Sequence, residues 1–182
     1  MPGFLKKSAI FTLMIASFFL ATGVFSIYAK SDDRKASVKK MEVAGYVERV
    51  TIYPENLTFE ARMDTGATSS SLNALDQERF KRDGADWIRF NVIDPDDKDK
   101  KITFEREIVR NVRILRHDGN HHLRPVVSMG FCMGTHYRQE DVTLQDRSKL
   151  TYQLLVGRKH LRNAVLVDSS SKHLLDPKCS KR

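Results

Sequence analysis

One short run of the sequence has the composition of a loop that presents a reactive carboxylate. Residues 62–71 read Arg-Met-Asp-Thr-Gly-Ala-Thr-Ser-Ser-Ser and contain the one Asp-Thr-Gly of the chain. An aspartate followed by a small hydroxyl residue and a glycine can project from a tight loop, because the hydroxyl locks the loop and the glycine lets a second backbone come close. Asp64 is therefore a candidate acid and base in hydrolysis. The alternative is an ordinary turn aspartate, since all three residue types also form turns.

Hydrolysis of a peptide bond by aspartates needs two carboxylates. They lie ~3 Å apart and share one proton, so that one activates water while the other polarises the carbonyl. The sequence supplies one such aspartate, because the nearest second candidate, Asp168 in Asp-Ser-Ser-Ser, lacks the glycine and is predicted to be structural. We therefore expect a symmetric homodimer in which each subunit contributes Asp64.

A second segment resembles a known partner of such a loop. Residues 154–161 read Leu-Leu-Val-Gly-Arg-Lys-His-Leu, which resembles the retropepsin segment in which a buried strand crosses behind the aspartate loop and leads into a short helix. With both motifs in this order, the chain resembles a retropepsin-like aspartic peptidase domain. More narrowly, it is similar to the bacterial family labelled ATP-dependent zinc protease and associated with RimK-type ligases. The resemblance covers about residues 43–175, including 43–46, 64–67, 87–90, 155–158 and 166–168.

The resemblance implies roles for eight residues of the two motifs. The catalytic group is Asp64, Thr65 and Gly66; the substrate-binding group is Ala67, Thr68 and Ser69; structural support comes from Gly157 and Arg158. Thr68 stands where many bacterial relatives have Arg and viral enzymes have an acidic residue. This position therefore offers no acidic side chain for an ion pair with Arg158. The serine run 69–71 can line a substrate cleft or form a solvated loop.

The elements that position these residues are predicted to be mostly strands. We expect a mostly-β, closed retropepsin-like barrel with one or two short helices. Alternating or β-branched runs predict strands at 43–53, 57–63, 87–93, 102–109, 112–115, 123–127, 142–144, 152–156 and 164–167. A turn is expected at 54–56, a helical turn within 71–82 and a short helix over 158–162.

The long stretch between the two motifs predicts an insertion relative to viral enzymes, which decorates the sheet or enlarges a flap. Within it, Asp118-Gly119 lies between apolar runs and indicates a hairpin. A hairpin lid excludes water from a scissile bond, so this hairpin is the candidate flap. A surface hairpin without a function is the alternative.

The N-terminal segment predicts export. Lys6 and Lys7 precede an uncharged, mostly apolar stretch over residues 8–29, which is typical of a signal peptide or of a retained signal anchor. We expect residues 1–29 to be this leader, 30–41 a charged linker, 42–176 the domain and 177–182 a basic tail. The domain would then be periplasmic, or anchored in the inner membrane and facing the periplasm. In an oxidising compartment Cys132 and Cys179 can form a disulfide or stay as two free thiols.

The net charge restricts the expected partners. The chain has a formal net charge of +8, or +6 without Lys6 and Lys7. A basic surface can be simply solvated or can attract an acidic partner, such as a polyanionic peptide or anionic lipid. No nucleic-acid partner is expected outside the cytoplasm.

Motifs for other chemistries are absent from the sequence. It has no His-Glu-x-x-His, no Cys-x-x-Cys, no phosphate-binding Gly-x-x-x-x-Gly-Lys and no Gly-x-Ser-x-Gly. No cofactor and no metal are therefore expected, although His117, His121 and His122 share one predicted turn and could bind a metal loosely. The favoured function is an exported aspartic endopeptidase acting on peptides or proteins. The alternatives are a non-catalytic peptide- or envelope-binding module on the same fold and a zinc-dependent peptidase.

Overall fold

Strands make up most of the structure, as the alternating sequence predicts. The computed structural model describes residues 41–115 and 121–179, and within these residues it contains ten strands and one short helix. In chain order the elements are β1 (Glu42–Tyr53), β2 (Leu57–Asp64), β3 (Ser70–Asn73), β4 (Leu75–Arg82), β5 (Ala85–Ile93), β6 (Lys101–Leu115), β7 (His121–Met133), β8 (His136–Gln145), β9 (Leu154–Gly157), α1 (Arg158–Leu161) and β10 (Val165–Lys172).

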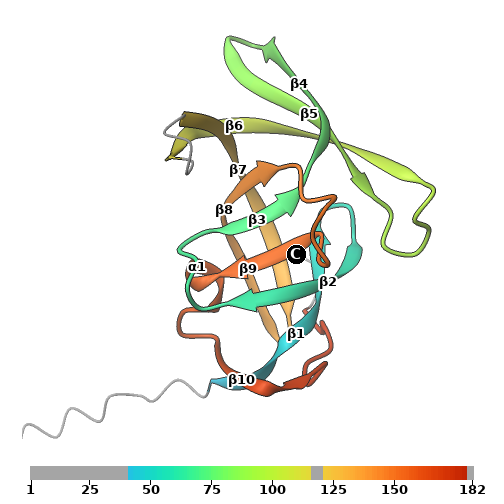
Figure 1. Cartoon of the computed structure of the whole chain (residues 1–182), viewed down its shortest axis with the longest axis vertical. Helices are drawn as coiled ribbons and strands as arrows, with labels where there is room; N and C mark the ends of the chain where they lie inside the picture. The colour runs from blue at the N-terminus through green and yellow to red at the C-terminus, as the bar shows by residue number, and fades with distance from the viewer. Residues whose placement is uncertain (1–40, 116–120, 180–182) are drawn as a thin grey trace, which may run out of the picture. The chain divides into compact units, whose positions relative to one another are not determined.

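Six of the strands close into a ring of pairings. The order β1-β2-β9-β3-β8-β7 is continuous, and β7 pairs back onto β1 through Thr51 opposite Cys132 and Ile52 opposite Phe131. β10 joins the outer edge of β1 in parallel. Figure 1 shows β9 lying between β2 and β3 within this ring. The prediction of a mostly-β fold is confirmed.

The side chains of the ring form one hydrophobic core. β2 shows how the sequence places them, because Phe59, Ala61 and Met63 are buried and alternate with exposed neighbours such as Glu60 and Arg62. This period of two is the pattern of a strand with one face on a core. The core then fixes the direction of β2, and with it the position of Asp64 at the end of the strand.

β4 and β5 lie outside the ring and extend the sheet. β6 joins the two parts, because residues 101–107 pair with β5 and the rest of the strand, from Ile108 onward, pairs with β7. Figure 1 shows β4, β5 and the first part of β6 continuing away from the six-stranded ring. This extension falls between the two motifs, where the sequence led us to expect an insertion.

Several predicted elements are confirmed and one is wrong. The turn at 54–56 joins β1 to β2, and α1 matches the predicted short helix. The predicted strands 102–109 and 112–115 are one strand, β6, with a register shift between Ile108 and Arg110. The expected helical turn within 71–82 is wrong, because this segment forms β3 and β4. Residues 70–73 are all buried between β8 and β9, so tertiary pairing overrides the local helix propensity.

The candidate flap is described only in part. β6 and β7 form a hairpin that pairs from Ile108 opposite Val127 to Leu115 opposite His121. Its predicted tip, Asp118-Gly119, and His117 lie outside the described residues, as do the leader and linker up to residue 40 and the last three residues of the basic tail. No helix within 41–115 or 121–179 is long and apolar enough to cross a membrane.

The C-terminal segment is attached to the ring by a disulfide and by hydrogen bonds. Cys179 forms a disulfide with Cys132 of β7, so the bonded alternative is the one present in the structure. The buried carboxylate of Glu48 accepts hydrogen bonds from the backbone N–H groups of Leu174 and Leu175, both at 3.0 Å. Because a buried carboxylate needs such donors, Glu48 and this segment stabilise each other.

Candidate active site

Asp64 is the last residue of β2, and its own loop holds its side chain. Oδ1 accepts hydrogen bonds from the backbone N–H groups of Gly66 at 2.8 Å and Ala67 at 3.0 Å. Within the described chain, Oδ2 has no hydrogen-bond partner. The carboxylate is half-buried, whereas Thr65 and Gly66 beside it are exposed. One oxygen is thus fixed in place and the other is left for a ligand.

β9 passes directly behind this loop. It runs parallel to β2, with Asp64 opposite Gly157, and antiparallel to β3, with Ser71 opposite Leu155. A Cβ atom at Gly157 would lie 2.6 Å from the carbonyl carbon and oxygen of Ser69. Because real Cβ contacts are never that short, only glycine fits where the strand crosses the backbone of the loop.

Arg158 binds the loop from the start of α1. Its Nη1 donates to the carbonyl oxygens of Thr65 at 3.1 Å and Gly66 at 2.6 Å, and its Nη2 donates to Oγ1 of Thr68 at 2.9 Å. In addition, the backbone N–H of Arg158 donates to the carbonyl of Ala67 at 2.9 Å. Thr68 therefore contacts Arg158 through a hydroxyl, and the loop is held without an ion pair.

A buried serine and histidine support the same crossing. Oγ of Ser70 accepts a hydrogen bond from the backbone N–H of Gly157 at 3.0 Å and lies 2.8 Å from Nδ1 of His160. Burial lowers the pKa of His160 to about 4, so the ring is neutral near pH 7. The ring also stacks on Phe131, with centroids 4.3 Å apart.

Sequence analysis missed this pair. The signal was present as a histidine at the helical end of the second motif, and as a serine run in which position 70 falls on the inward face of a strand. Neither signal predicts a contact between Ser70 and His160 unless the pairing of β3 with β9 is known, because the two residues are 90 residues apart in the sequence.

Arg147 is a buried cation within electrostatic range of Asp64. Burial lowers the pKa of Arg147, the charge of Arg124 lowers it further, and the carboxylate of Asp64 acts in the opposite direction. The Arg147 backbone N–H donates to Oδ1 of Asn73 at 2.7 Å and its Nε to the carbonyl of Tyr152 at 3.3 Å. Sequence analysis missed Arg147 too, because nothing in its local sequence links it to the Asp64 loop.

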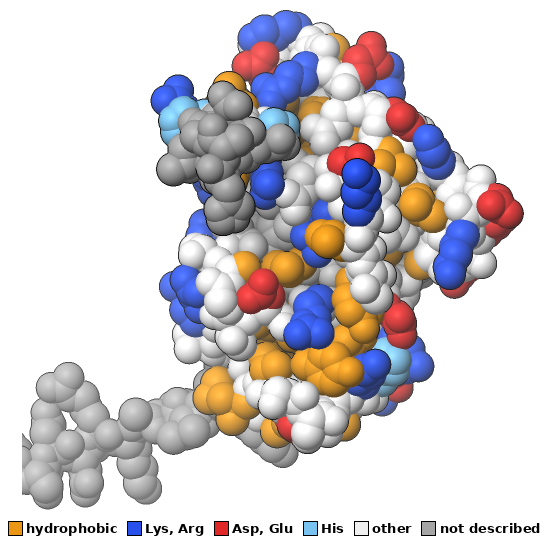
Figure 2. All heavy atoms as spheres, viewed as in Figure 1, with side chains coloured by type: hydrophobic (Ala, Val, Ile, Leu, Met, Phe, Trp, Pro, Cys, Tyr) orange, Lys and Arg blue, Asp and Glu red, His pale blue; other side chains and the backbone are white. Residues whose placement is uncertain are grey.

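An apolar hollow adjoins the aspartate loop. Its volume is about 540 Å³, and it is lined by Thr65 and Thr68 of the loop, by α1 and by residues 165–167 of β10. Of these lining residues, Leu166 is 55% exposed and is paired in register with Val43, which is 50% exposed. Figure 2 shows hydrophobic side chains gathered on the lower part of this face, where β1 and β10 lie in Figure 1.

The remaining candidates do not join the site. The carboxylate of Asp168 accepts hydrogen bonds from the N–H and hydroxyl of Ser170 and from the hydroxyl of Ser171, which is a structural role within β10. His121 and His122 are exposed on β7. The described residues contain no group of three His, Cys, Asp or Glu side chains that could hold a metal ion.

Comparison with known proteins places the chain in a family. Residues 43–178 match the RimB-like family, described as "Retropepsin-like aspartic endopeptidase RimB". The chain belongs to the RimB-like family. This confirms the resemblance to retropepsin-like domains that the two motifs indicated.

Relatives of this RimB-like chain include longer proteins. It is 31% identical over 118 residues to a "Probable alpha-L-glutamate ligase" of Shewanella halifaxensis and 32% identical over 118 residues to one of Parasynechococcus marenigrum. These matches cover 64% of this chain but only 26% and 25% of the relatives, so the chain spans about a quarter of their length.

Among solved structures, the chain is similar to a Legionella pneumophila protein of unknown function (DUF785). It aligns with a TM-score of 0.64 and 32% identity, over 74% of this RimB-like chain and 98% of that chain. The likeness therefore extends over almost the whole of the Legionella chain.

Proposed function

We propose that this RimB-like chain is an aspartic endopeptidase that acts as a homodimer, with one Asp64 from each subunit. The observation that carries the proposal is how hydrogen bonds hold the Asp64 carboxylate and its loop. Two backbone N–H groups fix Oδ1, no group of the described chain occupies Oδ2, and Arg158 holds the surrounding loop by three hydrogen bonds. Such an arrangement presents a carboxylate in one orientation, as acid and base catalysis requires.

The need for a second subunit follows from the chemistry. With one proton shared by two Asp64 carboxylates, the ionised one takes a proton from water as the water oxygen attacks the carbonyl carbon, while the protonated one donates a hydrogen bond to the carbonyl oxygen. The C–N bond of the tetrahedral intermediate then breaks, and the leaving nitrogen takes a proton from the pair of Asp64 carboxyl groups. One chain holds only half of this machinery.

The apolar surface beside the loop supports the dimer. The hollow of about 540 Å³ and the exposed pair Val43 and Leu166 adjoin Thr65 and Thr68. A second copy that covers this surface would remove apolar area from water. It would also bring the two Asp64 loops together across the two-fold axis.

For the substrate we propose a peptide that contains α-linked glutamate. The relatives are named as α-L-glutamate ligases, which concerns those longer proteins and serves here only as support. The charge agrees with an acidic substrate, since the chain has a net charge of +8.

We further propose that the protein works on the periplasmic side of the inner membrane, after export by residues 1–29. The Cys132–Cys179 disulfide supports this location, because disulfides persist in oxidising compartments.

The test is cleavage of two peptide substrates, poly-α-L-glutamate and a mixed neutral peptide library, by the purified full chain. We expect cleavage with a bell-shaped pH profile and a maximum below neutrality, because activity needs one shared proton. Asp64→Asn should abolish cleavage and leave the fold intact, whereas the matched control Asp168→Asn should retain it. Cleavage that survives Asp64→Asn but is lost with a chelator would overturn the proposal in favour of a zinc peptidase. Absence of cleavage in wild-type dimer would favour the binding module.

A further inference from the structure

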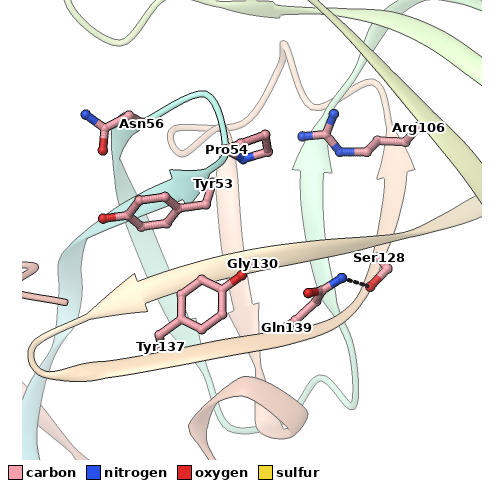
Figure 3. A pocket seen from close by; sticks show the side chains of 8 residues that line it. All are labelled: Tyr53, Pro54, Asn56, Arg106, Ser128, Gly130, Tyr137 and Gln139. Carbon is pink, nitrogen blue, oxygen red and sulfur yellow. Dashed lines mark hydrogen bonds between the residues drawn. The ribbon is translucent and has the colours of Figure 1, made fainter. Parts of the chain in front are cut away.

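A second pocket lies at the other end of β2 from Asp64. Its volume is about 520 Å³, which is within the range of small-molecule sites. Figure 3 shows the side chains that line it, which come from the end of β1, the turn after it, β6, β7 and β8. At ~3.3 Å per strand residue, the eight residues of β2 separate this pocket from Asp64 by about 25 Å. It is therefore not part of the aspartate site.

Two tyrosines form an aromatic corner in this pocket. The rings of Tyr53 and Tyr137 have centroids 5.8 Å apart and an interplanar angle of 75°. Tyr137 lies directly over Gly130, where a Cβ atom would come within 2.2 Å of the phenol oxygen. Tyr137 is 38% exposed, so part of its surface is open to a ligand. Open aromatic surface of this kind packs against the C–H face of a sugar ring.

The polar groups beside the corner are planar amides and hydroxyls. Nε2 of Gln139 donates to Oγ of Ser128 at 3.1 Å, as the dashed line in Figure 3 marks, and this bond orients the amide. Oε1 of Gln139 makes no hydrogen bond within the described chain. Asn56, on the turn at the edge of the pocket, adds a second amide that is exposed. An amide offers a donor and an acceptor in one plane, which suits neighbouring sugar hydroxyls.

The pocket carries no uncompensated charge. Its one charged lining residue, Arg106, donates from Nη2 to both carboxylate oxygens of Glu55 at 2.6 and 2.7 Å, and from Nη1 to the carbonyl of Glu105 at 2.8 Å. A bound carboxylate, phosphate or ammonium group would thus find no opposite charge available. The composition favours a neutral ligand with many hydroxyl groups.

We propose that this pocket binds an uncharged oligosaccharide. Tyr53 and Tyr137 pack against the sugar rings, and the amides of Gln139 and Asn56 bond their hydroxyls. Because the pocket lies far from the Asp64 loop along β2, a glycan can be bound there while the loop engages another molecule. The site would hold the protein on a glycan-bearing surface, whether or not the chain is a peptidase.

The test is isothermal titration of the purified full chain with three neutral probes, maltotriose, cellotriose and chitotriose. We expect at least one to bind with a Kd below about 1 mM. Tyr137→Ala should weaken this binding about tenfold, because it removes the exposed aromatic surface on which the sugar ring packs. Gln139→Ala should weaken it severalfold.

The control is Gln77→Ala, because Gln77 is also an exposed strand glutamine with one side-chain hydrogen bond, to the carbonyl of Ala74. It should bind the probe as the wild type does. Thermal unfolding checks each variant, and if Tyr137→Ala does not fold, Gln139→Ala decides alone. The proposal is overturned if no probe binds with a Kd below about 1 mM, or if both pocket variants bind the probe as the wild type does. It is also overturned if a proline-rich peptide, the other common occupant of aromatic-lined grooves, binds in place of the sugars.

Discussion

The hydroxyl oxygen of Ser70 lies 2.8 Å from Nδ1 of His160, and both side chains are buried behind the Asp64 loop. The same oxygen accepts the backbone N–H of Gly157. Three elements, β3, β9 and α1, therefore meet at one serine hydroxyl. Since β9 in turn pairs with the end of β2, this contact helps to hold the strand that carries Asp64.

Ser70→Ala should destabilise the fold by about 2 to 3 kcal/mol, because it leaves a buried N–H of Gly157 and a buried imidazole nitrogen without a partner. Urea unfolding measures the effect. Ser69→Ala is the matched control, since Ser69 is a neighbouring serine whose hydroxyl makes no hydrogen bond within the described chain. Equal stability of the two variants would show that the contact is not important for the fold.

The pH dependence of stability should report His160. Burial lowers its pKa from 6.5 to about 4, so the unfolded chain takes up a proton before the native chain does. Stability is then complete above pH 6.5 and falls as the pH decreases toward 4, by about 3 kcal/mol in total. Below pH 4, His160 causes no further loss of stability, because it is then protonated in both the native and the unfolded chain.

A histidine variant separates this effect from acid unfolding in general. His160→Phe should show a shallower loss of stability between pH 6.5 and 4 than the wild type, measured by urea unfolding at each pH. His121→Ala, at an exposed histidine, should keep the wild-type slope. An unchanged slope in His160→Phe would contradict the assignment.

Arg158→Lys should keep the fold and impair the loop. A lysine has the charge but not the planar fork that reaches three oxygens of the loop at once. We expect a stability loss of about 1 kcal/mol and a decrease of about tenfold in kcat/KM, because the Asp64 loop becomes less well oriented. Arg79→Lys is the control, at an exposed arginine whose side chain bonds only Asn111 among the described residues. Full activity of Arg158→Lys would contradict this prediction.

Leu166→Glu should lower the dimer fraction and the cleavage activity together. It introduces a charge into the apolar surface beside the aspartate loop, where a second copy is proposed to pack. Analytical ultracentrifugation over a range of concentrations measures the dimer. Leu150→Glu is a close control, because Leu150 is 54% exposed and Leu166 55%. A fully active monomer would rule out the shared-carboxylate mechanism.

Local patterns in the sequence predicted much of the fold. Alternation along 57–63 predicted β2, and the composition of the following residues predicted a loop that presents Asp64. Both depend on the nearest neighbours in the chain, since side chains of a strand alternate between faces and Gly66 permits a tight loop. The helix expected within 71–82 failed because β3 is decided by its partners, β8 and β9, which lie far along the sequence.

By itself the sequence determined which residues could do chemistry at Asp64, and that a glycine and an arginine would follow a buried strand at 157 and 158. The tertiary structure decided how these parts meet. It placed Gly157 against the backbone of Ser69, gave Arg158 its three oxygens in the loop, and brought His160 to Ser70. Such contacts join segments about 90 residues apart, so they depend on strand pairing and on burial, which no local pattern encodes.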